Sequence, residues 1–380
     1  MAARKFSCRG VVTMKIVNGL VFGADHKMHK EDLCFENGVI TENTACEEIY
    51  DAADCYVLPG FIDTHIHGAN GVEFYASEGD LTPALDWLTS EGVTSIMATM
   101  ATDYPEGLVR AVDRIVEQND DRIIGIHAEG PFINVIRKGG MAEECIQTPS
   151  AALTEEMHAH SNGLLKLMTM APELEGAQEV INVCKKLGIT LSMGHTNAVY
   201  EEAKAGVDAG FSRATHTYNA MRPLNHRDPG ILGLALTDDR VTCELICDEH
   251  HVSPPAMQIV VRCKGPEKVT MISDNSFYAG LPEGEYCGEG GRKMFVKDGF
   301  CKLENGVICG SAVSLAVGAK NMFDLGFKPE EIAVMAWVNP AKAADCKDRG
   351  ELKPGMRADV IVLDKTFMVQ AVFSAGKRVK

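Results

Sequence analysis

Histidine and carboxylate side chains stand at the ends of several short apolar runs in the sequence. Six residues share this position: His65, His67, Glu129, His195, His216 and Asp274. Their imidazole nitrogens and carboxylate oxygens form a ligand set that suits Zn²⁺ or another divalent first-row metal. Each residue alone is a weak signal, because a single histidine is more often a hydrogen-bonded core residue. All six in the same relation to predicted strands predict a metal site, and residues two apart, such as His65 and His67, face the same way.

Other histidines and cysteines close to these positions have more than one interpretation. His127 shares a strand face with Glu129, so it could support the metal site from behind or simply pack in the core. Cys243 and Cys247 in the segment TCELIC could bind a metal ion as soft thiolate ligands. Free cysteine in an apolar run behaves as a small hydrophobe, however, and we favour that interpretation.

The apolar runs that carry the predicted ligands number eight along the chain. They cover residues 61–67, 93–100, 122–129, 164–171, 189–195, 212–218, 241–248 and 269–274. Amphipathic stretches of helical length separate most of them, although the segment 218–239 shows no clear helix. Repeated strand and helix units of this kind predict a (β/α)8 barrel, in which the carboxyl ends of all strands meet on the face where active sites are built.

The two ends of the chain have a different texture from the middle. Residues 1–56 and 349–380 alternate polar and apolar positions between turn signals, as small antiparallel sheets do. Asn18-Gly19 and Asn37-Gly38 are predicted to form hairpin turns. We therefore expect a small β-sandwich built from both termini, beside a catalytic barrel formed by residues 57–348.

Composition and charge exclude several classes of protein. The chain has 37 basic and 53 acidic residues, a net charge of −16 that repels phosphate backbones and anionic lipid. We therefore expect no nucleic-acid or membrane partner, and no window approaches the ~18 apolar residues of a membrane-spanning helix. Thirteen cysteines without a C-x-x-C pair, together with a first segment that lacks an apolar signal core, indicate a reducing cytoplasm.

The segments around the six residues resemble those of a known superfamily. PGFIDTHIHG, HAEGPF, MGHTNA, THTYNAM, SDN and KPGMRADVIVLD are similar to amidohydrolase motifs, and HAEGPF and THTYNAM are the most specific of them. Within that superfamily they resemble the family of N-acetylglucosamine-6-phosphate deacetylases. The resemblance covers essentially the whole chain. It implies a barrel with a β-sandwich, a divalent metal centre, a cytoplasmic homodimer, and hydrolysis of the acetamide of an amino-sugar phosphate.

The resemblance also assigns roles to the ligand residues. It makes Glu129, His195 and His216 the metal ligands common to the family, and Asp274 the general acid and base. Because the H-x-H pair is present, it further implies a second ion held by His65 and His67, with Glu129 as the bridge. The run at 164–171 lacks the bridging lysine that many amidohydrolases modify. We expect one or two ions per chain, with Zn²⁺ as the first choice and Fe, Co, Mn or Ni as alternatives.

The substrate contacts that the resemblance implies lie in loops. They are Gly140, Asn219, Ala220, Arg227, His251, Ile308, Cys309 and Gly310. Arg227 and His251 are the expected phosphate partners, because a guanidinium and an imidazolium donate charge-assisted hydrogen bonds to a dianion. Two departures leave the choice of sugar epimer open. Met141 stands where the family commonly has a histidine, and NSFYAG follows Asp274.

The expected reaction is hydrolysis of N-acetyl-D-glucosamine 6-phosphate to glucosamine 6-phosphate and acetate. Water activated by the metal attacks the acetyl carbonyl, and Asp274 accepts its proton and returns it to the departing amine. The alternatives are an N-acetylgalactosamine-6-phosphate deacetylase, or a cyclic-amide hydrolase or deaminase that would not need Arg227 and His251. A non-enzymatic scaffold relative is a further alternative, although such proteins usually lose metal ligands and all six are present here.

Overall fold

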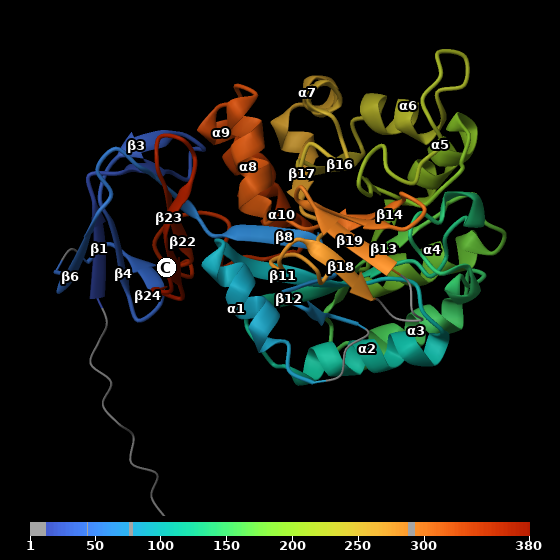
Figure 1. The fold of residues 1–380 in the computed structure, drawn as a ribbon, viewed down its shortest axis with the longest axis horizontal. Coiled ribbons are helices and arrows are strands. Elements are labelled where there is room, and N and C mark those ends of the chain that lie inside the picture. Colours follow the sequence, from blue (N-terminus) through green and yellow to red (C-terminus); the bar gives the residue numbers. More distant parts are fainter. Residues whose placement is uncertain (1–12, 44, 76–78, 288–292) are drawn as a thin grey trace, which may run out of the picture.

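A central barrel contains all eight predicted runs. The computed structural model describes residues 13–43, 45–75, 79–287 and 293–380. Among them, eight parallel strands form one sheet (Figure 1): β8 (Phe61–Ile66), β11 (Val93–Met100), β12 (Ile123–Glu129), β13 (Leu165–Met170), β14 (Thr190–Met193), β15 (Arg213–Ala214), β16 (Thr242–Ile246) and β17 (Val269–Ile272). The strands are buried on both faces, as expected for a parallel sheet covered by helices. The predicted barrel fold is confirmed.

Backbone hydrogen bonds just beyond β17 join the eighth strand to the first. The amide of Asp274 donates to the carbonyl of His65 at 2.9 Å, and the amide of His67 donates to the carbonyl of Asn275 at 2.9 Å. Asp274 was predicted as a ligand at the opposite end of the barrel sequence from His65 and His67, and these hydrogen bonds place it beside them. Closure of the barrel is what brings them together.

A helix follows each barrel strand on the outside of the barrel. These helices are α1 (Thr82–Ser90), α2 (Pro105–Glu117), α3 (Ala151–His160), α4 (Ala177–Leu187), α5 (Tyr200–Ala209), α6 (Gly230–Thr237), α7 (Pro254–Lys264) and α8 (Leu315–Asp324). After α8 come α9 (Pro329–Ala333), a π-helical turn at Val334–Val338 and α10 (Asn339–Ala343). The expectation of no helix within 218–239 was wrong. Seven of the eight residues of α6 are buried, so its sequence has no polar face to reveal helical periodicity.

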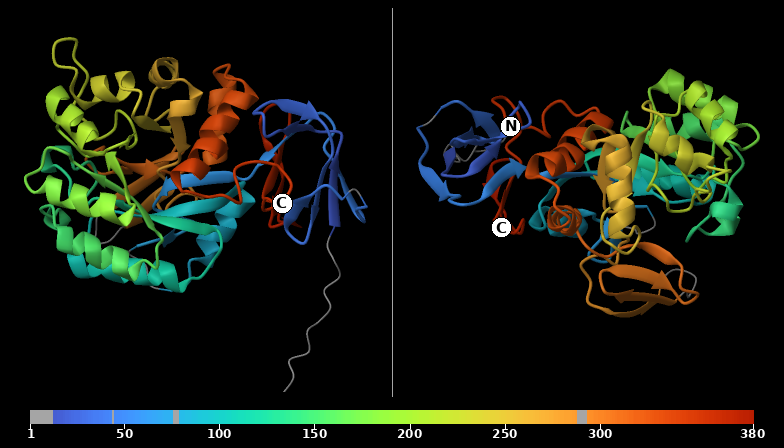
Figure 2. Two further views of the ribbon diagram at one scale, coloured as in Figure 1. Left: turned by 180° about the vertical axis from the view of Figure 1, so that it is seen from behind. Right: turned by 90° about the horizontal axis from the view of Figure 1, so that it is seen from above.

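Strands from both termini form two sheets beside the barrel (Figures 1 and 2). One has the order β5 (Val39–Thr41), β4 (Leu33–Glu36), β1 (Thr13–Val17) and β6 (Glu48–Asp51). The other has the order β24 (Lys377–Arg378), β23 (Val369–Ser374), β22 (Val360–Leu363), β7 (Tyr56–Pro59), β2 (Leu20–Phe22) and β3 (Met28–Lys30). Ile16, Phe35, Val57 and Phe373 belong to one buried cluster shared by the two sheets. The β-sandwich predicted from both termini is thus present.

The two predicted turns in this region have different outcomes. Asn37 and Gly38 have φ values of 50° and 84° and connect the antiparallel strands β4 and β5, so this hairpin is confirmed. The hairpin predicted at Asn18-Gly19 was wrong, because β1 and β2 belong to different sheets. A Cβ at Gly19 would lie 2.5 Å from Val57 Cγ2. This glycine therefore permits close packing where the chain crosses between the sheets.

A four-stranded antiparallel sheet lies between β17 and α8 and was not predicted. Its strands are β18 (Gly284–Cys287), β19 (Lys293–Lys297), β20 (Phe300–Leu303) and β21 (Ile308–Ser311). A short hairpin of β9 (Gly68–Ala69) and β10 (Val72–Glu73) precedes α1. Figure 2 shows the inserted sheet on a different side of the barrel from the terminal sheets. Because residues at the end of β21 are hydrogen-bonded to the segment that follows β17, the sheet forms part of the wall above the barrel.

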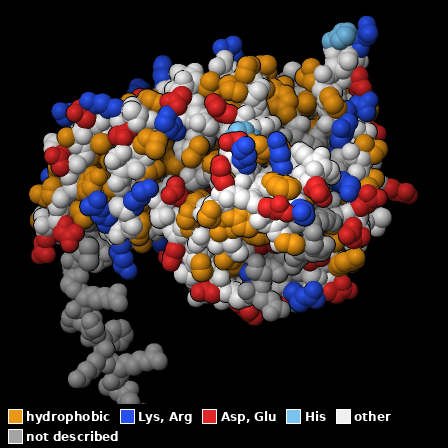
Figure 3. All heavy atoms as spheres, viewed as in Figure 1, with side chains coloured by type: hydrophobic (Ala, Val, Ile, Leu, Met, Phe, Trp, Pro, Cys, Tyr) orange, Lys and Arg blue, Asp and Glu red, His pale blue; other side chains and the backbone are white. Residues whose placement is uncertain are grey.

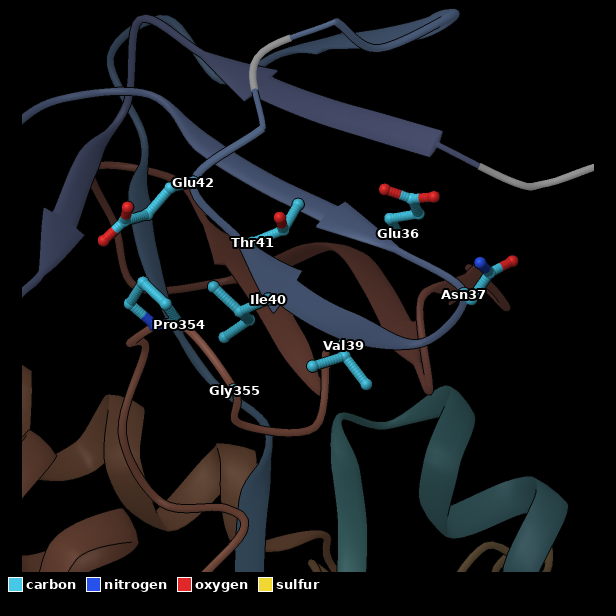
Figure 4. Close-up of a pocket in the computed structure, with 8 residues that line it drawn as sticks. All are labelled: Glu36, Asn37, Val39, Ile40, Thr41, Glu42, Pro354 and Gly355. Atoms are coloured by element: carbon cyan, nitrogen blue, oxygen red, sulfur yellow. The ribbon is translucent and has the colours of Figure 1, made fainter.

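A surface groove lies beside the edge strand β5 of the terminal sheets, lined on its other side by Pro354 and Gly355 (Figure 4). The edge is protected, because the amide of Ile40 donates to the carbonyl of Met356 and the amide of Gly355 donates to the carbonyl of Ile40.

No disulfide joins the cysteines that the structure describes. Within the same residues, the helices are too short or too polar to cross a membrane.

Gly194, which connects β14 to His195, provides a test of how tightly the barrel interior is packed. A methyl group there would lie 2.6 Å from Thr169 Cγ2 and 2.7 Å from Thr215 Cβ. Overpacking of this kind costs roughly 1–3 kcal/mol, so Gly194→Ala should lower the free energy of unfolding in urea by that amount. The control is Gly284→Ala on β18, where the added carbon meets only Tyr286 at 3.9 Å. Equal losses in the two variants would contradict the proposed packing.

Candidate active site

Side chains from the first, third, fifth, sixth and eighth strands converge on the carboxylate of Glu129. Its Oε1 lies 3.1 Å from His195 Nε2 and 2.8 Å from His216 Nε2. Its Oε2 lies 3.2 Å from His67 Nε2. Asp274 Oδ1 lies 3.3 Å from the same nitrogen of His67. His65 Nε2 also lies 3.3 Å from Glu129 Oε1. Glu129 therefore stands between two sets of ligand-type atoms and contacts members of both.

These atoms form two groups that could each hold a cation. One contains Glu129, His195 and His216, and the other contains His65, His67 and Asp274; within each group the candidate ligand atoms lie within 4.8 Å of one another. The side chains are largely buried, with 2% exposure at Glu129 and 13% at both His67 and Asp274. The second group is thus the one that solvent or a substrate reaches more easily.

The donor atoms of this cluster fit a divalent metal. His65 Nε2 lies 3.3 Å from Glu129 and 3.5 Å from Asp274, yet it has no hydrogen-bond partner within the described part of the chain. The Nε2 atoms of His195 and His216 lie 3.1 Å apart. Two imidazole nitrogens this close cannot both carry protons without repulsion, whereas a cation accepts both lone pairs. Buried carboxylates and neutral imidazoles together are the ligand set that such a metal requires.

The backbone at three of the candidate ligands is in the left-handed region. The φ values are 46° at His195, 30° at His216 and 52° at Asp274. Non-glycine residues rarely adopt this conformation, and each instance costs on the order of 1–3 kcal/mol. Each of the three residues lies two positions beyond the end of a barrel strand, so the turn in the backbone directs its side chain over the end of the barrel. The surrounding hydrogen bonds must maintain this geometry.

Burial and charge act against each other at the two carboxylates. Burial opposes ionisation of Asp274, but the positive charge of His65 and a hydrogen bond from His67 outweigh it and lower the pKa of Asp274 to about 2. Burial likewise opposes ionisation of Glu129, and the charges of His65 and His195 lower its pKa well below the usual value. Both carboxylates are therefore ionised at neutral pH and can bind a cation or accept a proton.

The histidines respond to the same charges in the opposite direction. Burial disfavours the charged form of His67, but hydrogen bonds with Asp274 and Glu129 raise its pKa to about 9. Burial acts in the same way on His65, and the charges of Glu129 and Asp274 raise its pKa well above the usual value. Without a metal, protons on these rings supply the positive charge that the carboxylates need. A divalent cation supplies that charge with neutral imidazoles.

Residues behind the ligands position them. His127 is fully buried, donates or accepts hydrogen bonds with Thr169 at 2.8 Å and Thr99 at 3.4 Å, and packs perpendicular to His65 with ring centroids 4.6 Å apart. Burial, together with the nearby charge of His65, lowers the pKa of His127 well below its usual value. This residue is thus a neutral support behind the cluster, and it combines the two interpretations considered from sequence.

Three charged residues near the cluster were missed from sequence. Glu244 on β16 and Arg213 on β15 are buried against each other, with 3.2 Å between Glu244 Oε1 and Arg213 Nη2. Glu173 accepts hydrogen bonds from Thr196 Oγ1 at 2.6 Å and the Asn197 amide at 2.7 Å, which fixes the loop after His195. For Glu244 the sequence does contain a signal, because it is a single charged residue inside the apolar run TCELIC. Only the two cysteines of that run were interpreted from the sequence.

Several of the expected substrate contacts lie around the cluster. A Cβ at Gly139 would lie 3.4 Å from the His195 ring and 3.9 Å from Ala220, and a Cβ at Gly140 would lie 2.6 Å from Cys309 Sγ. Asn219 Nδ2 donates to the carbonyl of His216. Gly310 and Ile308 belong to β21, and a Cβ at Gly310 would lie 2.9 Å from the Asp274 carbonyl oxygen. The structure thus brings these loop segments to the same end of the barrel.

The two expected phosphate partners differ in their surroundings. His251 has a side chain that is only 6% exposed, and its Nδ1 lies 2.7 Å from Asp248. Burial lowers the pKa of His251, but the hydrogen bond and charge of Asp248, with a contribution from Asp274, raise it above the usual value. This residue is therefore available as a charged donor close to the cluster.

Arg227 lies on an exposed loop between β15 and α6. Its amide donates a hydrogen bond to the Asn225 side chain of the same loop, and an ion pair between Arg222 and Asp228 closes the base of that loop. Figure 3 shows a histidine and basic side chains at the tip of the projecting loop. In contrast to His251, Arg227 is not brought to the ligand cluster by contacts within the described part of the chain.

Comparison with known proteins identifies the class. The sequence model of the amidohydrolase family matches residues 56–379, which include the whole barrel and the ligand cluster. The chain therefore belongs to the amidohydrolase family.

More specific relatives include sugar-phosphate deacetylases. An N-acetylglucosamine-6-phosphate deacetylase of Bacillus subtilis (strain 168) is 34% identical over 83% of each chain. An N-acetylgalactosamine-6-phosphate deacetylase of Escherichia coli O157:H7 is 33% identical over 84% of this chain and 87% of the relative. The structure of a mutant N-acetyl-D-glucosamine-6-phosphate deacetylase of Mycobacterium smegmatis in complex with N-acetyl-D-glucosamine-6-phosphate matches 97% of this chain and 99% of that chain, with a TM-score of 0.89 and 29% identity.

The raised pKa of His67 predicts how pH changes the effect of metal on stability. The folded-state pKa of about 9 exceeds the usual 6.5, so in metal-free protein this group stabilises the fold fully below about pH 6.5 and ceases to do so as pH rises through 9. Metal binding needs the neutral ring. The difference in Tm between metal-loaded and metal-free protein should therefore widen between pH 6.5 and 9. A difference that narrows over this range would contradict the proposed cluster electrostatics.

Proposed function

We propose that this chain hydrolyses the acetamide of N-acetyl-D-glucosamine 6-phosphate to glucosamine 6-phosphate and acetate. The observation that carries the proposal is the pair of adjacent ligand groups, in which Glu129 of one group lies 3.2 Å from His67 of the other and Asp274 is on the more accessible side. The named activities of relatives such as those of Bacillus subtilis and Mycobacterium smegmatis support the choice of substrate.

The chemistry needs an activated water and a group that carries a proton. A divalent metal bound at the cluster supplies a water of lowered pKa and polarises the acetyl carbonyl. Asp274 is ionised and reachable, so Asp274 Oδ1 accepts the proton of the attacking water. The same carboxyl then returns that proton to the sugar nitrogen, because an amine leaves only when it is protonated. Glu129 is 2% exposed, its Oε1 is hydrogen-bonded to His195 and His216, and its Oε2 lies 3.2 Å from His67. We therefore assign Glu129 to metal binding and not to proton transfer.

The proposed site follows the roles assigned by resemblance. His65, His67, Glu129, His195, His216 and Asp274 hold Zn²⁺ or a related divalent ion, and Asp274 is also the catalytic group. The sugar phosphate contacts Gly140, Asn219, Ala220, Arg227, His251 and the segment from Ile308 through Cys309 to Gly310. We further propose that the enzyme acts in the cytoplasm as a homodimer, which size-exclusion chromatography with light scattering tests.

The N-acetylgalactosamine epimer is a second candidate substrate. The relative from Escherichia coli O157:H7 carries that activity in its name, and Met141 stands where the resemblance to the family implies a histidine. Acetate release from both N-acetylhexosamine 6-phosphates and their unphosphorylated sugars, with metal analysis of the same preparation, tests the proposal. Activity on cyclic amides alone, or activity without a divalent ion, would contradict it.

Asp274→Asn tests the proton carrier. The amide cannot accept a proton, and general acid–base help contributes about 10²- to 10⁴-fold, so kcat should fall by that factor while the variant folds and still binds substrate. The measurements are acetate release, Tm and isothermal titration with the sugar phosphate. A kcat within about tenfold of the parent enzyme would show that another group moves the proton.

Arg227→Ala tests recognition of the phosphate. Loss of a charge-assisted hydrogen bond costs roughly 1.5–3 kcal/mol, so kcat/KM for the 6-phosphate should fall about ten- to a hundredfold, with little change for the unphosphorylated sugar. Arg240→Ala is a matched control, because Arg240 is exposed and already paired with Asp238 and Asp208. Equal losses on both sugars would mean that Arg227 supports the fold or the dimer.

A further inference from the structure

Glu244 lies fully buried inside the barrel, directly behind the ligand cluster, and no step of the proposed reaction uses it. Its Oε2 lies 3.1 Å from His65 Nδ1 and 3.3 Å from the amide nitrogen of His216. Its Oε1 lies 3.2 Å from Arg213 Nη2. One carboxylate thus contacts a candidate ligand of each metal group and a cation on the neighbouring strand.

The strand direction explains why Glu244 and Arg213 face inward. Cys243 and Leu245 pack in the outer core with the helices, so Glu244 between them faces the barrel interior. Arg213 precedes Ala214 of the same outer core and therefore also faces inward. An isolated charge would be strongly disfavoured at this depth, but the opposite charges of the pair compensate each other. His65 and Arg213 together oppose the effect of burial and lower the pKa of Glu244 to about 2. Arg213 contacts Oε1, which leaves Oε2 to face His65.

We propose that Glu244, held by Arg213, is a positioning residue that makes His65 a metal ligand. The inference rests on the proposed function. His65 Nδ1–H donates to Glu244 Oε2, so the lone pair of His65 is confined to Nε2, which faces Glu129 and Asp274. A carboxylate behind a metal-binding histidine fixes the tautomer and the ring orientation and raises the basicity of the ligand nitrogen.

The other candidate ligands have different supports. His195 Nδ1 lies 2.9 Å from the backbone carbonyl of Arg137, so a neutral oxygen fixes its tautomer. His216 Nδ1 is buried and has no hydrogen-bond partner among the described residues. Glu244 also accepts the His216 amide, which helps to hold the positive φ of that residue. A carboxylate behind the ring is thus specific to His65, and its loss should affect chiefly the position formed by His65, His67 and Asp274.

Glu244→Gln separates a positioning role from a space-filling one. If the amide oxygen of the variant faces His65, its NH₂ group faces the Arg213 guanidinium, and two donors meet. If the amide turns over, its NH₂ group faces His65 Nδ1, which must then accept, so the proton moves to Nε2 and blocks metal binding. The substitution preserves shape and volume, but either orientation disturbs the ligand.

The experiment measures metal binding directly. Chelator competition with Zn²⁺, and the visible absorption of Co²⁺-loaded protein, should show one ion bound about 10- to 100-fold more weakly in Glu244→Gln and the other little changed. In a His65→Ala background the same substitution should add no further weakening at that position. If Glu244→Gln fails to fold, the paired variant Glu244→Gln with Arg213→Met is measured in its place. The second substitution removes the guanidinium donor that would face the amide NH₂ group. The paired variant should bind the His65-side ion more weakly than the parent, because the carboxylate charge is lost.

Lys264→Met is the control for removal of a buried charge elsewhere. Lys264 is 9% exposed and donates to the Asp238 carbonyl at 2.7 Å, so this variant should lose stability and keep both ions. Two ions bound with parental affinity in Glu244→Gln would overturn the inference and leave the proposed function intact. The same result in the paired variant would do so if Glu244→Gln does not fold. A parent protein that binds no divalent ion would instead overturn the proposed function. Equal weakening of both ions would assign Glu244 a general structural role and also overturn the inference.

Discussion

The buried carboxylate of Glu129 sets the main constraint on this structure. A charge that is 2% exposed is tolerated only when both of its oxygens meet positive groups or donors. Here Oε2 faces His67, and Oε1 faces His65, His195 and His216. These partners come from the ends of different strands, so they can be supplied only if the barrel closes with the observed strand order. Closure in turn depends on the backbone hydrogen bonds that join the segment after β17 to the end of β8. The need of the Glu129 carboxylate for positive partners is therefore met only when the first and last strands pair in the observed register.

Neighbouring residues offset the energetic cost of burying the charged cluster. Glu244 and Arg213 offset each other behind His65, and His127 is held neutral by burial and the nearby charge of His65. The positive φ values at His195, His216 and Asp274 store strain that these surrounding contacts must offset. A cluster that is ionised, strained and dehydrated is unfavourable for folding alone. Such an arrangement is more readily explained by a requirement to bind a cation, which is why the geometry supports a metal centre more strongly than the residue types do.

Sequence patterns predicted the elements whose side chains have a fixed relation to the strand. The eight barrel strands and the six candidate ligands followed from apolar runs with polar residues at their ends. Glu244 was missed because a single charged residue inside an apolar run gives no periodic signal, and α6 because burial on all sides removes its polar face. The omission of the inserted sheet was avoidable, since Asp298-Gly299 and Asn305-Gly306 are hairpin signals between alternating residues. The hairpin at Asn18-Gly19 was predicted wrongly because a turn signal was present but the turn connects strands of two different sheets.

The candidate metal ligands and the proposed substrate contacts differ in how well the sequence predicts their positions, and the difference has a physical reason. Ligands at strand ends are positioned by the barrel itself, so residue type and strand phase determine where they meet. The proposed substrate contacts lie on loops and on the inserted strand β21, whose positions depend on neighbours that sequence patterns do not specify. Gly140 shows this dependence, because its missing side chain leaves room that Cys309 of the unpredicted sheet occupies. Two segments thus form the wall of the proposed substrate site together, and Met141 follows Gly140 in one of them. Retaining the ligand set therefore preserves the hydrolytic chemistry, whereas the choice between sugar epimers depends on how these loop segments pack against one another.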